Sequence, residues 1–195
     1  ILVTGSYGQL GRSLFHYLNT NIEIFWTGRN IPLDQKGFYL DILDRINFKE
    51  LIRLHEPDIL INLAALTNVD LCEKNPVLAK EINCKGVANI CDIFKGKIIQ
   101  LSTDYVFDGK NGPYVEEDVT SPLSVYGNTK LEAEKIIQSH NSKNLIIRGN
   151  VLYDNYKYSE ASFLNWVVKS LNKKVSIDVV DDQINNPTWT ESMAK

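Results

Sequence analysis

The sequence has little cysteine and no long apolar run. Cys72, Cys84 and Cys91 are odd in number and show no CxxC spacing, which argues against a disulfide framework and favours a reduced, cytoplasmic protein whose cysteines fill the core. No apolar stretch approaches the roughly 20 residues that cross a bilayer, and the start ILVTG is too short for a signal peptide. These absences argue against a membrane protein and a disulfide-stapled domain.

An excess of charge of either sign is also lacking. The chain has 21 Lys and Arg against 24 Asp and Glu, for a net charge of −3, and the two signs alternate along it. The basic stripe that nucleic acid binding needs is missing, as is a polybasic patch for a membrane surface. His16, His55 and His140 share no ligand spacing, so no metal site is predicted.

What the sequence does contain is a regular alternation of short apolar runs and longer amphipathic ones. Runs such as LVT, ILIN and IIQL are almost wholly apolar, as expected of strands covered on both faces. The pattern predicts an α/β fold, a Rossmann-like doubly wound parallel sheet with helices on both faces. Strands are expected at 1–3, 22–26, 58–62, 97–101, 144–148 and 175–180, and helices at 8–19, 44–55, 75–94, 124–140 and 161–172.

The motif GSYGQLG lies between the first expected strand and the first helix. Gly5, Gly8 and Gly11 would permit a tight turn, close approach of a pyrophosphate and close helix–strand contact. The spacing GxxGxxG differs from the commoner GxGxxG, and an ordinary glycine-rich turn is the alternative, but the position predicts a dinucleotide site. The cofactor-binding residues expected here are Gly5, Tyr7, Gly8, Gln9, Leu10 and Gly11.

The second expected strand indicates which dinucleotide is bound. The segment IEIFWTGRN offers Arg29 where an acidic residue would bind the ribose hydroxyls of NAD. A guanidinium suits a 2′-phosphate, so NADP (NADPH) is favoured over NAD, unless Arg29 is only a solvated loop charge. Asp41 and Ile42 are placed to contact the adenine, although an Asp before a helix is also an ordinary cap.

Two later strands end in residues suited to the same edge of the sheet. In NLAALTNVD, Ala64 and Ala65 beside Leu63 would let a flat cofactor approach, although alanines also begin helices. In LSTDYVFDG, the hydroxyl of Ser102 or Thr103 could bind a substrate carbonyl. A Ser-Thr pair after a strand is also a common turn or cap.

The motif YGNTK places Tyr126 and Lys130 on one face of a helix. A free tyrosine has a pKa of about 10, and an adjacent ammonium is expected to lower the pKa of Tyr126. Tyr126 then becomes a usable general acid or base. Lys130 could hold ribose hydroxyls, and Thr103 could steady a carbonyl oxygen. YxxxK alone occurs by chance in many helices, whereas the ordered set with the glycine loop and STD is far more specific.

This set resembles the extended short-chain dehydrogenase/reductase family, and in particular its dTDP-4-dehydrorhamnose reductase branch. The similarity runs over nearly the whole chain, through GSYGQLG, EINCKGVANI, STDYVFDG, SPLSVYGNTKLEAE and DDQINNPTW. It implies a Thr103, Tyr126, Lys130 triad and NAD(P)H-dependent reduction of the C4 ketone of a nucleotide-linked 4-keto-6-deoxysugar, with Tyr126 as general acid. The resemblance also implies that Ser102, Tyr126 and Lys130 contact the cofactor. The substrate contacts that it implies are Thr103, Asp104, Tyr105, Val106 and Asn150. The implied role of Asn83 is to brace the backbone of the active site.

The resemblance also implies a domain organisation. Residues 1–149 are expected to form the dinucleotide-binding domain, and 150–195 to begin a smaller substrate-binding lobe that is truncated here, because the family continues beyond this point. The segment RGNVLYD differs from the Arg-Thr-Ser-Trp-like segment typical of the branch, with Val151 in place of an aromatic ring. The particular sugar is therefore open.

Other functions remain as alternatives. One is a non-catalytic NADP-binding regulatory subunit that resembles the one of methionine adenosyltransferase, which has no need of Thr103, Tyr126 and Lys130 together. Another is a nucleotide-sugar epimerase or dehydratase with tightly held NAD; Asp104 is a candidate for the additional acid. A homodimer is also open.

Overall fold

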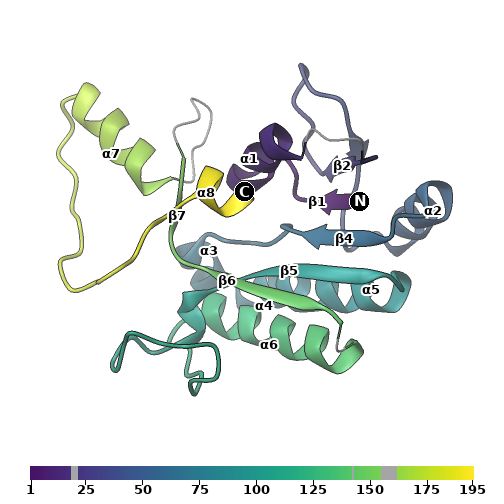
Figure 1. The fold of residues 1–195 in the computed structure, drawn as a ribbon. Helices are drawn as coiled ribbons and strands as arrows, with labels where there is room; N and C mark the ends of the chain where they lie inside the picture. Colours follow the sequence, from purple (N-terminus) through teal and green to yellow (C-terminus); the bar gives the residue numbers. More distant parts are fainter. Residues whose placement is uncertain (19–21, 142, 155–161) are drawn as a thin grey trace.

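The computed structural model describes residues 1–18, 22–141, 143–154 and 162–195, and its centre is a parallel sheet (Figure 1). The six strands lie in the order β3-β2-β1-β4-β5-β6, and each neighbouring pair is parallel. They are β1 (Leu2–Thr4), β2 (Phe25–Gly28), β3 (Phe38–Tyr39), β4 (Ile59–Asn62), β5 (Lys97–Thr103) and β6 (Leu145–Gly149). The order reverses between β1 and β4, and ligands of such sheets bind at the carboxyl ends of the strands near this point.

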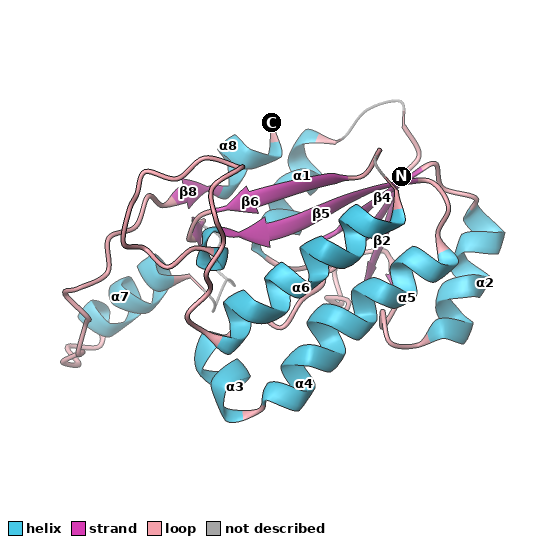
Figure 2. Ribbon diagram, turned by 90° about the horizontal axis from the view of Figure 1, so that it is seen from below, coloured by secondary structure: helices cyan, strands magenta, loops and turns pink. Residues whose placement is uncertain are grey.

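Helices cover both faces of the sheet, as predicted (Figures 1 and 2). They are α1 (Gln9–Tyr17), α2 (Arg45–His55), α3 (Val69–Lys74), α4 (Pro76–Lys80), α5 (Gly86–Ile93), α6 (Val125–His140), α7 (Phe163–Asn172) and α8 (Thr190–Ala194). The α2, α5 and α6 helices pack on one face, and α1 and α8 on the other. The doubly wound Rossmann-like fold is therefore confirmed.

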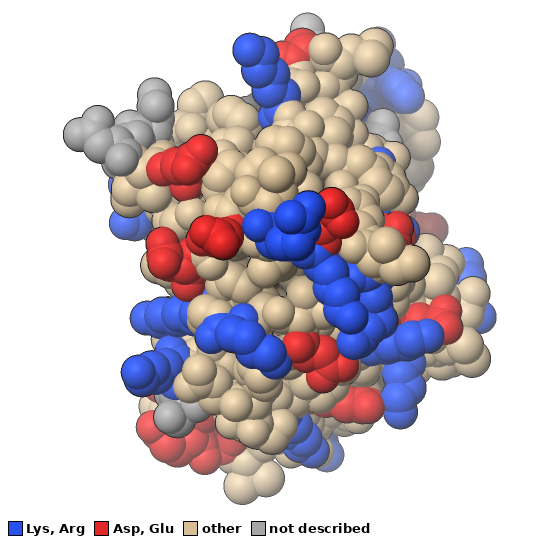
Figure 3. Space-filling view, turned by 90° about the vertical axis from the view of Figure 1, so that its right-hand side faces the viewer, with Lys and Arg blue, Asp and Glu red and all other residues tan. Residues whose placement is uncertain are grey.

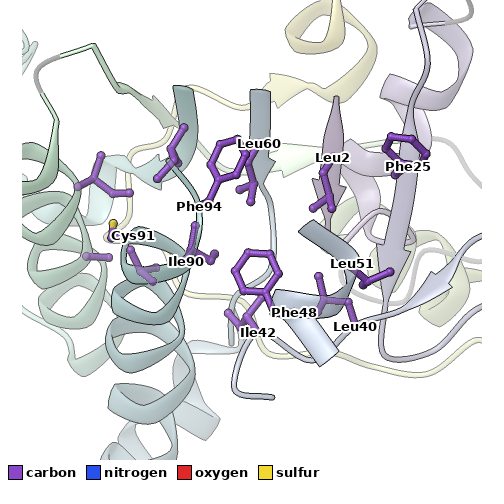
Figure 4. Packing of buried hydrophobic residues seen from close by; sticks show 14 residues of the cluster. Leu2, Phe25, Leu40, Ile42, Phe48, Leu51, Leu60, Ile90, Cys91 and Phe94 are labelled. Atoms are coloured by element: carbon purple, nitrogen blue, oxygen red, sulfur yellow. The ribbon is translucent and has the colours of Figure 1, made fainter. Parts of the chain in front are cut away.

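Alternate residues of the central strands supply two separate cores. Leu2 and Leu60 pack with Phe48 on the α2, α5 and α6 side (Figure 4). Val3 faces the other way and packs with Leu14 of α1. Because both faces are covered, both sets of positions are apolar, which explains the continuous apolar runs in the sequence.

The cysteines behave as core residues. All three are free and buried, and burial raises the pKa of Cys84 to about 12 and that of Cys91 to about 11. High thiol pKa values leave little reactive thiolate at neutral pH. Over the described ranges, no helix combines the length and apolarity that a bilayer crossing needs. Acidic and basic side chains are interspersed on the face drawn in Figure 3.

Several predicted elements differ in the structure. The predicted strand at 175–180 is wrong: this segment has no strand partner, and Val175 and Val180 are more than half exposed. The second strand begins at Phe25, opposite Leu2, and not at residue 22. The predicted helix 75–94 contains a π-helical turn, Glu81–Lys85, between α4 and α5, and α3 was not predicted. Residues 19 and 161, the outer ends of two predicted helices, lie outside the described residues.

The last part of the chain returns to the sheet. The β7 strand (Leu152–Tyr153) pairs with β8 (Thr188–Trp189) in a small parallel sheet. The α8 helix then packs on α1, where Ser13 Oγ donates to Thr190 Oγ1 at 2.8 Å. The α7 helix stands apart (Figure 1), and Phe163 and Leu171 on it are more than half exposed.

Candidate active site

The glycine loop is built as the motif predicts. Gly5 has a φ of +65°, and a Cβ there would lie 2.7 Å from the backbone nitrogen of Ala64. A Cβ on Gly11 would lie 2.1 Å from the carbonyl oxygen of Ser6, so only glycine lets α1 start this close to the preceding turn. A Cβ on Gly8 would meet only the Gly5 carbonyl, at 3.4 Å. The space beside Gly8 is therefore open.

Donors at the start of α1, next to Gly8, lack partners of their own. The N-cap residue Gly8 provides no side-chain cap, so the first backbone N–H groups of α1 are uncapped. Among the described residues, the buried Gln9 Nε2 has no hydrogen-bond partner. Uncapped N–H groups and an unpaired amide beside an open glycine fit a pyrophosphate group.

Tyr7 braces the loop that follows β2. A Cβ on Gly28 would lie 2.8 Å from Tyr7 Cδ2, and one on Gly37 would overlap the Tyr7 hydroxyl oxygen. That hydroxyl donates to the carbonyl of Lys36 at 3.2 Å. The Tyr7 ring is thus occupied by the loop that carries Arg29, and the Tyr7 carbonyl accepts from Arg12 Nε at 3.0 Å, so a cofactor contact at Tyr7 falls to its backbone N–H.

Arg29 is available at the adenosine end of the expected cofactor site. Its side chain is 58% exposed, and Nη1 lies 3.9 Å from the carboxylate of Asp41. A long, exposed pair of this kind contributes little stability, and the guanidinium is free to bind another anion. Asp41 also accepts from the backbone N–H of Leu43 at 2.9 Å, in the turn before α2; the N-cap of α2 is Asp44 and not Asp41.

Four predicted contact residues have side chains that are engaged elsewhere. Leu10 and Ile42 lie in the two hydrophobic cores, and Val106 is fully buried. The Ser102 hydroxyl donates to Glu134 at 2.5 Å. Any contact of these four residues with a cofactor or substrate would therefore come from the backbone, and their predicted roles stay a prediction; position in a motif does not determine the direction of a side chain.

The three predicted catalytic side chains converge at the end of β5. The Thr103 side chain lies close enough to the Tyr126 hydroxyl to lower the pKa of Tyr126, and Lys130 Nζ donates to the carbonyl of Leu101 at 2.7 Å. Sequence reasoning missed Gly127, where a Cβ would lie 2.3 Å from the Tyr105 carbonyl. The sequence signal for this role was the glycine inside YGNTK, because a residue without a side chain lets α6 approach the end of β5 closely.

The protonation of the pair differs from the prediction. Burial raises the pKa of Tyr126 to about 12, against a smaller lowering by the neighbouring Thr103 side chain. Burial lowers the pKa of Lys130 to about 8, and Glu134 and Cys84 oppose this shift. The prediction that Lys130 lowers the Tyr126 pKa is wrong for this structure, because desolvation dominates and the ammonium is bound to Leu101. At neutral pH, Tyr126 is a phenol and Lys130 an ammonium.

Asn83 connects the catalytic helix with the end of β4. Its Oδ1 accepts from the N–H of Leu66 at 2.7 Å, and its Nδ2 donates to Thr129 Oγ1 at 3.0 Å. Thr129 in turn donates to the carbonyl of Tyr126 at 2.8 Å. Asn83 sits in the π-helical turn, a local irregularity often found at functional sites. The bracing contact implied by the resemblance is present.

Sequence reasoning also missed a buried polar chain across the sheet. Thr4 Oγ1 donates to Asn62 Oδ1 at 2.5 Å, and Asn62 Nδ2 donates to Gln100 Oε1 at 2.7 Å. Gln100 Nε2 then donates to the same Leu101 carbonyl that binds Lys130, at 2.8 Å. The signal was one polar residue in each apolar strand run. Buried polar groups with complete partners specify one arrangement of the strands.

The predicted substrate residues Asp104, Tyr105 and Asn150 lie together beside Tyr126. The rings of Tyr105 and Tyr126 meet edge to face, with centroids 5.9 Å apart. Asn150 donates through its side-chain amide to the Asp104 carboxylate, and burial raises the pKa of Asp104. No group of three or more His, Cys, Asp or Glu within the described ranges is arranged to hold a metal ion.

Comparison with known proteins gives consistent similarities. The whole chain, residues 1–195, matches the family described as the RmlD substrate binding domain. It is 35% identical over 198 residues to a dTDP-4-dehydrorhamnose reductase of Sinorhizobium fredii, covering 100% of this chain and 63% of the relative. It is 30% identical over 200 residues to methionine adenosyltransferase 2 subunit beta of Danio rerio, covering 100% and 61%.

Among solved structures, the chain resembles a dTDP-4-dehydrorhamnose reductase of Bacillus anthracis in complex with NADP. The TM-score is 0.87 at 30% sequence identity, and the match covers 99% of this chain and 66% of the other. The chain therefore spans less than two thirds of the length of these three proteins.

Proposed function

The chain belongs to the family of RmlD substrate binding domains, and on that premise we propose that it reduces the C4 ketone of a nucleotide-linked 4-keto-6-deoxysugar with NADPH. The observation that carries the proposal is the convergence of Thr103, Tyr126 and Lys130 at the end of β5. This end lies at the carboxyl edge of the sheet, as the open glycine loop does. The names of two of its relatives, dTDP-4-dehydrorhamnose reductases, support the same reaction class, which belongs to dTDP-rhamnose and polysaccharide biosynthesis.

Each catalytic side chain has a role that its surroundings allow. A nicotinamide cofactor held at this edge of the sheet would supply the hydride for the carbonyl carbon. Tyr126 donates its phenolic proton to the carbonyl oxygen as that oxygen becomes an alkoxide, and the pKa of about 12 keeps the proton on Tyr126 until then. Thr103 steadies the same oxygen by a hydrogen bond, and the Lys130 ammonium binds the nicotinamide ribose. Asp104, Tyr105 and Asn150 bind the sugar.

The division of the chain follows the same proposal. Residues 1–149 bind the cofactor through the glycine loop and Arg29, and residues 150–195 begin the substrate-binding lobe. A cytoplasmic location accords with three free cysteines, and a homodimer is part of the proposal. Sedimentation of the protein at several concentrations tests the dimer, and a constant monomer mass would contradict it.

Turnover of a sugar nucleotide is the direct test of the function. The full-length protein is mixed with NADPH and a panel of nucleotide-linked 4-keto-6-deoxysugars, and the absorbance of the reduced nicotinamide is followed. We expect loss of absorbance with at least one member of the panel. NADPH binding without turnover of any member would contradict the reductase function.

A regulatory subunit is the second candidate. The similarity to methionine adenosyltransferase 2 subunit beta favours it, and such a subunit would bind NADP without reducing a sugar. Binding of NADPH together with a change in methionine adenosyltransferase activity, and no turnover in the panel, would support this function over the first.

Replacing Arg29 with Ala tests the choice of cofactor. Loss of a charge-assisted hydrogen bond to the 2′-phosphate should weaken NADPH binding by about 1.5–3 kcal/mol, on the order of 10- to 100-fold, and leave NADH binding unchanged. The dissociation constants of both cofactors give the ratio. Arg53→Ala is the matched control, because Arg53 makes an exposed ion pair with Glu50 on α2. An unchanged NADPH/NADH ratio in Arg29→Ala would remove Arg29 from the cofactor site.

A further inference from the structure

A buried ion pair lies between the catalytic helix and β6. Glu134 on α6 is 1% exposed and follows Lys130 by one turn on the same helix face. Its Oε1 accepts from Ser102 Oγ at 2.5 Å and from Arg148 Nε at 3.0 Å, and its Oε2 accepts from Arg148 Nη2 at 2.7 Å. The two parallel bonds hold the guanidinium of Arg148 in one orientation.

The same guanidinium reaches outward to the loop between β5 and α6, which is teal in Figure 1. Arg148 Nη1 donates to the carbonyl of Glu116 at 3.0 Å, and the guanidinium lies over the ring of Phe107, 5.1 Å from its centroid. Phe107 stacks on Tyr114 with centroids 4.4 Å apart, and the Tyr114 hydroxyl donates to Asp108 at 2.7 Å. Arg148 thus contacts this loop at two points, and ring stacking extends the contact along it.

The loop is attached to the candidate active site at its ends. It leaves the site directly after Thr103 and Asp104, and on its return the backbone N–H of Ser121 donates to the carbonyl of Val106 at 2.9 Å. Between these points residues 107–118 are exposed for the most part. An exposed segment of this kind has few contacts to keep it in one position, and Arg148 supplies two of them, at Phe107 and at Glu116.

We propose that Arg148, oriented by Glu134, is a positioning residue for the nucleotide-sugar substrate, because it fixes residues 107–118 against the sheet edge where the catalytic side chains converge. The inference rests on the proposed function for the identity of the substrate. The fixed loop continues the segment that carries Asp104 and Tyr105, so it affects the sugar side of the site and leaves the glycine loop unchanged.

Cleavage by trypsin measures the position of the loop without any reference to catalysis. Lys110 is exposed within the loop, and trypsin cuts after lysine. In Arg148→Met we expect cleavage after Lys110 to be about tenfold faster or more, because the loop loses a charge-assisted hydrogen bond and a cation–π contact. Arg53→Met, which removes an arginine from an exposed ion pair on α2, is the control and should leave this cleavage rate unchanged.

Steady-state kinetics measure the consequence for the substrate. In Arg148→Met, the KM for the sugar nucleotide should rise about tenfold or more, while the dissociation constant of NADPH stays at the parent value. Arg148→Lys should bring the KM only part of the way back to the parent value, because an ammonium keeps the positive charge but cannot make the two parallel hydrogen bonds of a guanidinium. A merely structural role would instead weaken cofactor and substrate binding together.

A loop-side variant keeps the test valid if loss of Arg148 prevents folding. Arg148→Met leaves the buried Glu134 carboxylate without its bidentate partner, whereas Phe107→Leu removes the ring under the guanidinium and leaves the ion pair intact. Phe107→Leu should also raise both the cleavage rate and the KM. Unchanged cleavage after Lys110 in this variant would overturn the attachment, and faster cleavage with an unchanged KM would overturn the positioning role. If the parent reduces no sugar nucleotide, the proposed function fails, and the cleavage rates still decide the attachment.

Discussion

Replacing Tyr126 with Phe is expected to lower kcat by about 10²- to 10⁴-fold, the usual contribution of a positioned general acid. The phenol is the donor proposed for the carbonyl oxygen, because it lies beside Thr103 at the end of β5. Phe keeps the ring and its edge-to-face contact with Tyr105, so the fold should not change. NADPH affinity should stay near the parent value. Oxidation of NADPH under saturating sugar nucleotide gives kcat, and fluorescence titration gives the cofactor affinity.

A tyrosine elsewhere in the chain separates loss of the acid from loss of any hydroxyl. Tyr17 on α1 donates through its hydroxyl to Glu191, and Tyr17→Phe is expected to keep the parent kcat. The Thr103 hydroxyl keeps hydrogen-bond partners in Tyr126→Phe, because it donates to Asp104 and accepts from the N–H of Tyr105. Full activity of Tyr126→Phe would eliminate the tyrosine as the proton donor.

The sheet and the glycine loop could be predicted because each depends on local signals. Strands buried on both faces are continuous apolar runs, and the alternation with amphipathic helices defines the parallel order. Gly5 and Gly11 could be assigned to a turn and a close contact from spacing alone, and the structure shows both. The prediction of a strand at 175–180 failed because it depends on a distant partner. A strand needs a neighbouring strand to pair with, and the periodicity of a sequence does not show whether a sheet has a free edge for it.

The details of the site depend on tertiary packing. Ser102 and Thr103 are adjacent in the sequence, yet one hydroxyl turns inward to Glu134 and the other lies at Tyr126, because successive side chains of a strand point to opposite faces. The high pKa of Tyr126 arises from burial, which depends on every element around it. The bond from Asn83 to Thr129 needs the π-helical turn, for which the sequence offers no simple signal.

Replacing Lys130 with Met should abolish most activity without unfolding the protein. The variant loses the ammonium proposed to hold the nicotinamide ribose, so NADPH affinity and kcat/KM should both fall, the latter by about 10²-fold or more. The Leu101 carbonyl keeps its second donor, Gln100 Nε2, and Glu134 keeps Ser102 and Arg148. Removal of a buried charge should leave the melting temperature equal or higher. Unchanged NADPH affinity and kcat/KM would contradict the role of Lys130.

Lys130 should contribute to activity and to stability with opposite dependence on pH. Its pKa is lowered from 10.5 to about 8 in the folded state, so the ammonium, and with it cofactor binding, is lost as the pH rises through about 8. Between about 8 and 10.5 the unfolded chain binds more protons at this group than the folded chain, so the contribution of Lys130 to the free energy of unfolding increases with pH over that window. Burial lowers the pKa of Lys130, Glu134 and Cys84 face the ammonium and oppose this shift, and the Leu101 carbonyl accepts a hydrogen bond from it. The buried cysteines, whose pKa values are raised, contribute equally to the parent and to Lys130→Met, so the difference in free energy of unfolding between the two proteins isolates Lys130. Urea denaturation at pH 7 to 10 should show this difference change in favour of the parent above pH 8, and NADPH titration should show loss of affinity with pH in the parent alone; a difference that stays constant with pH would contradict the shifted pKa of Lys130.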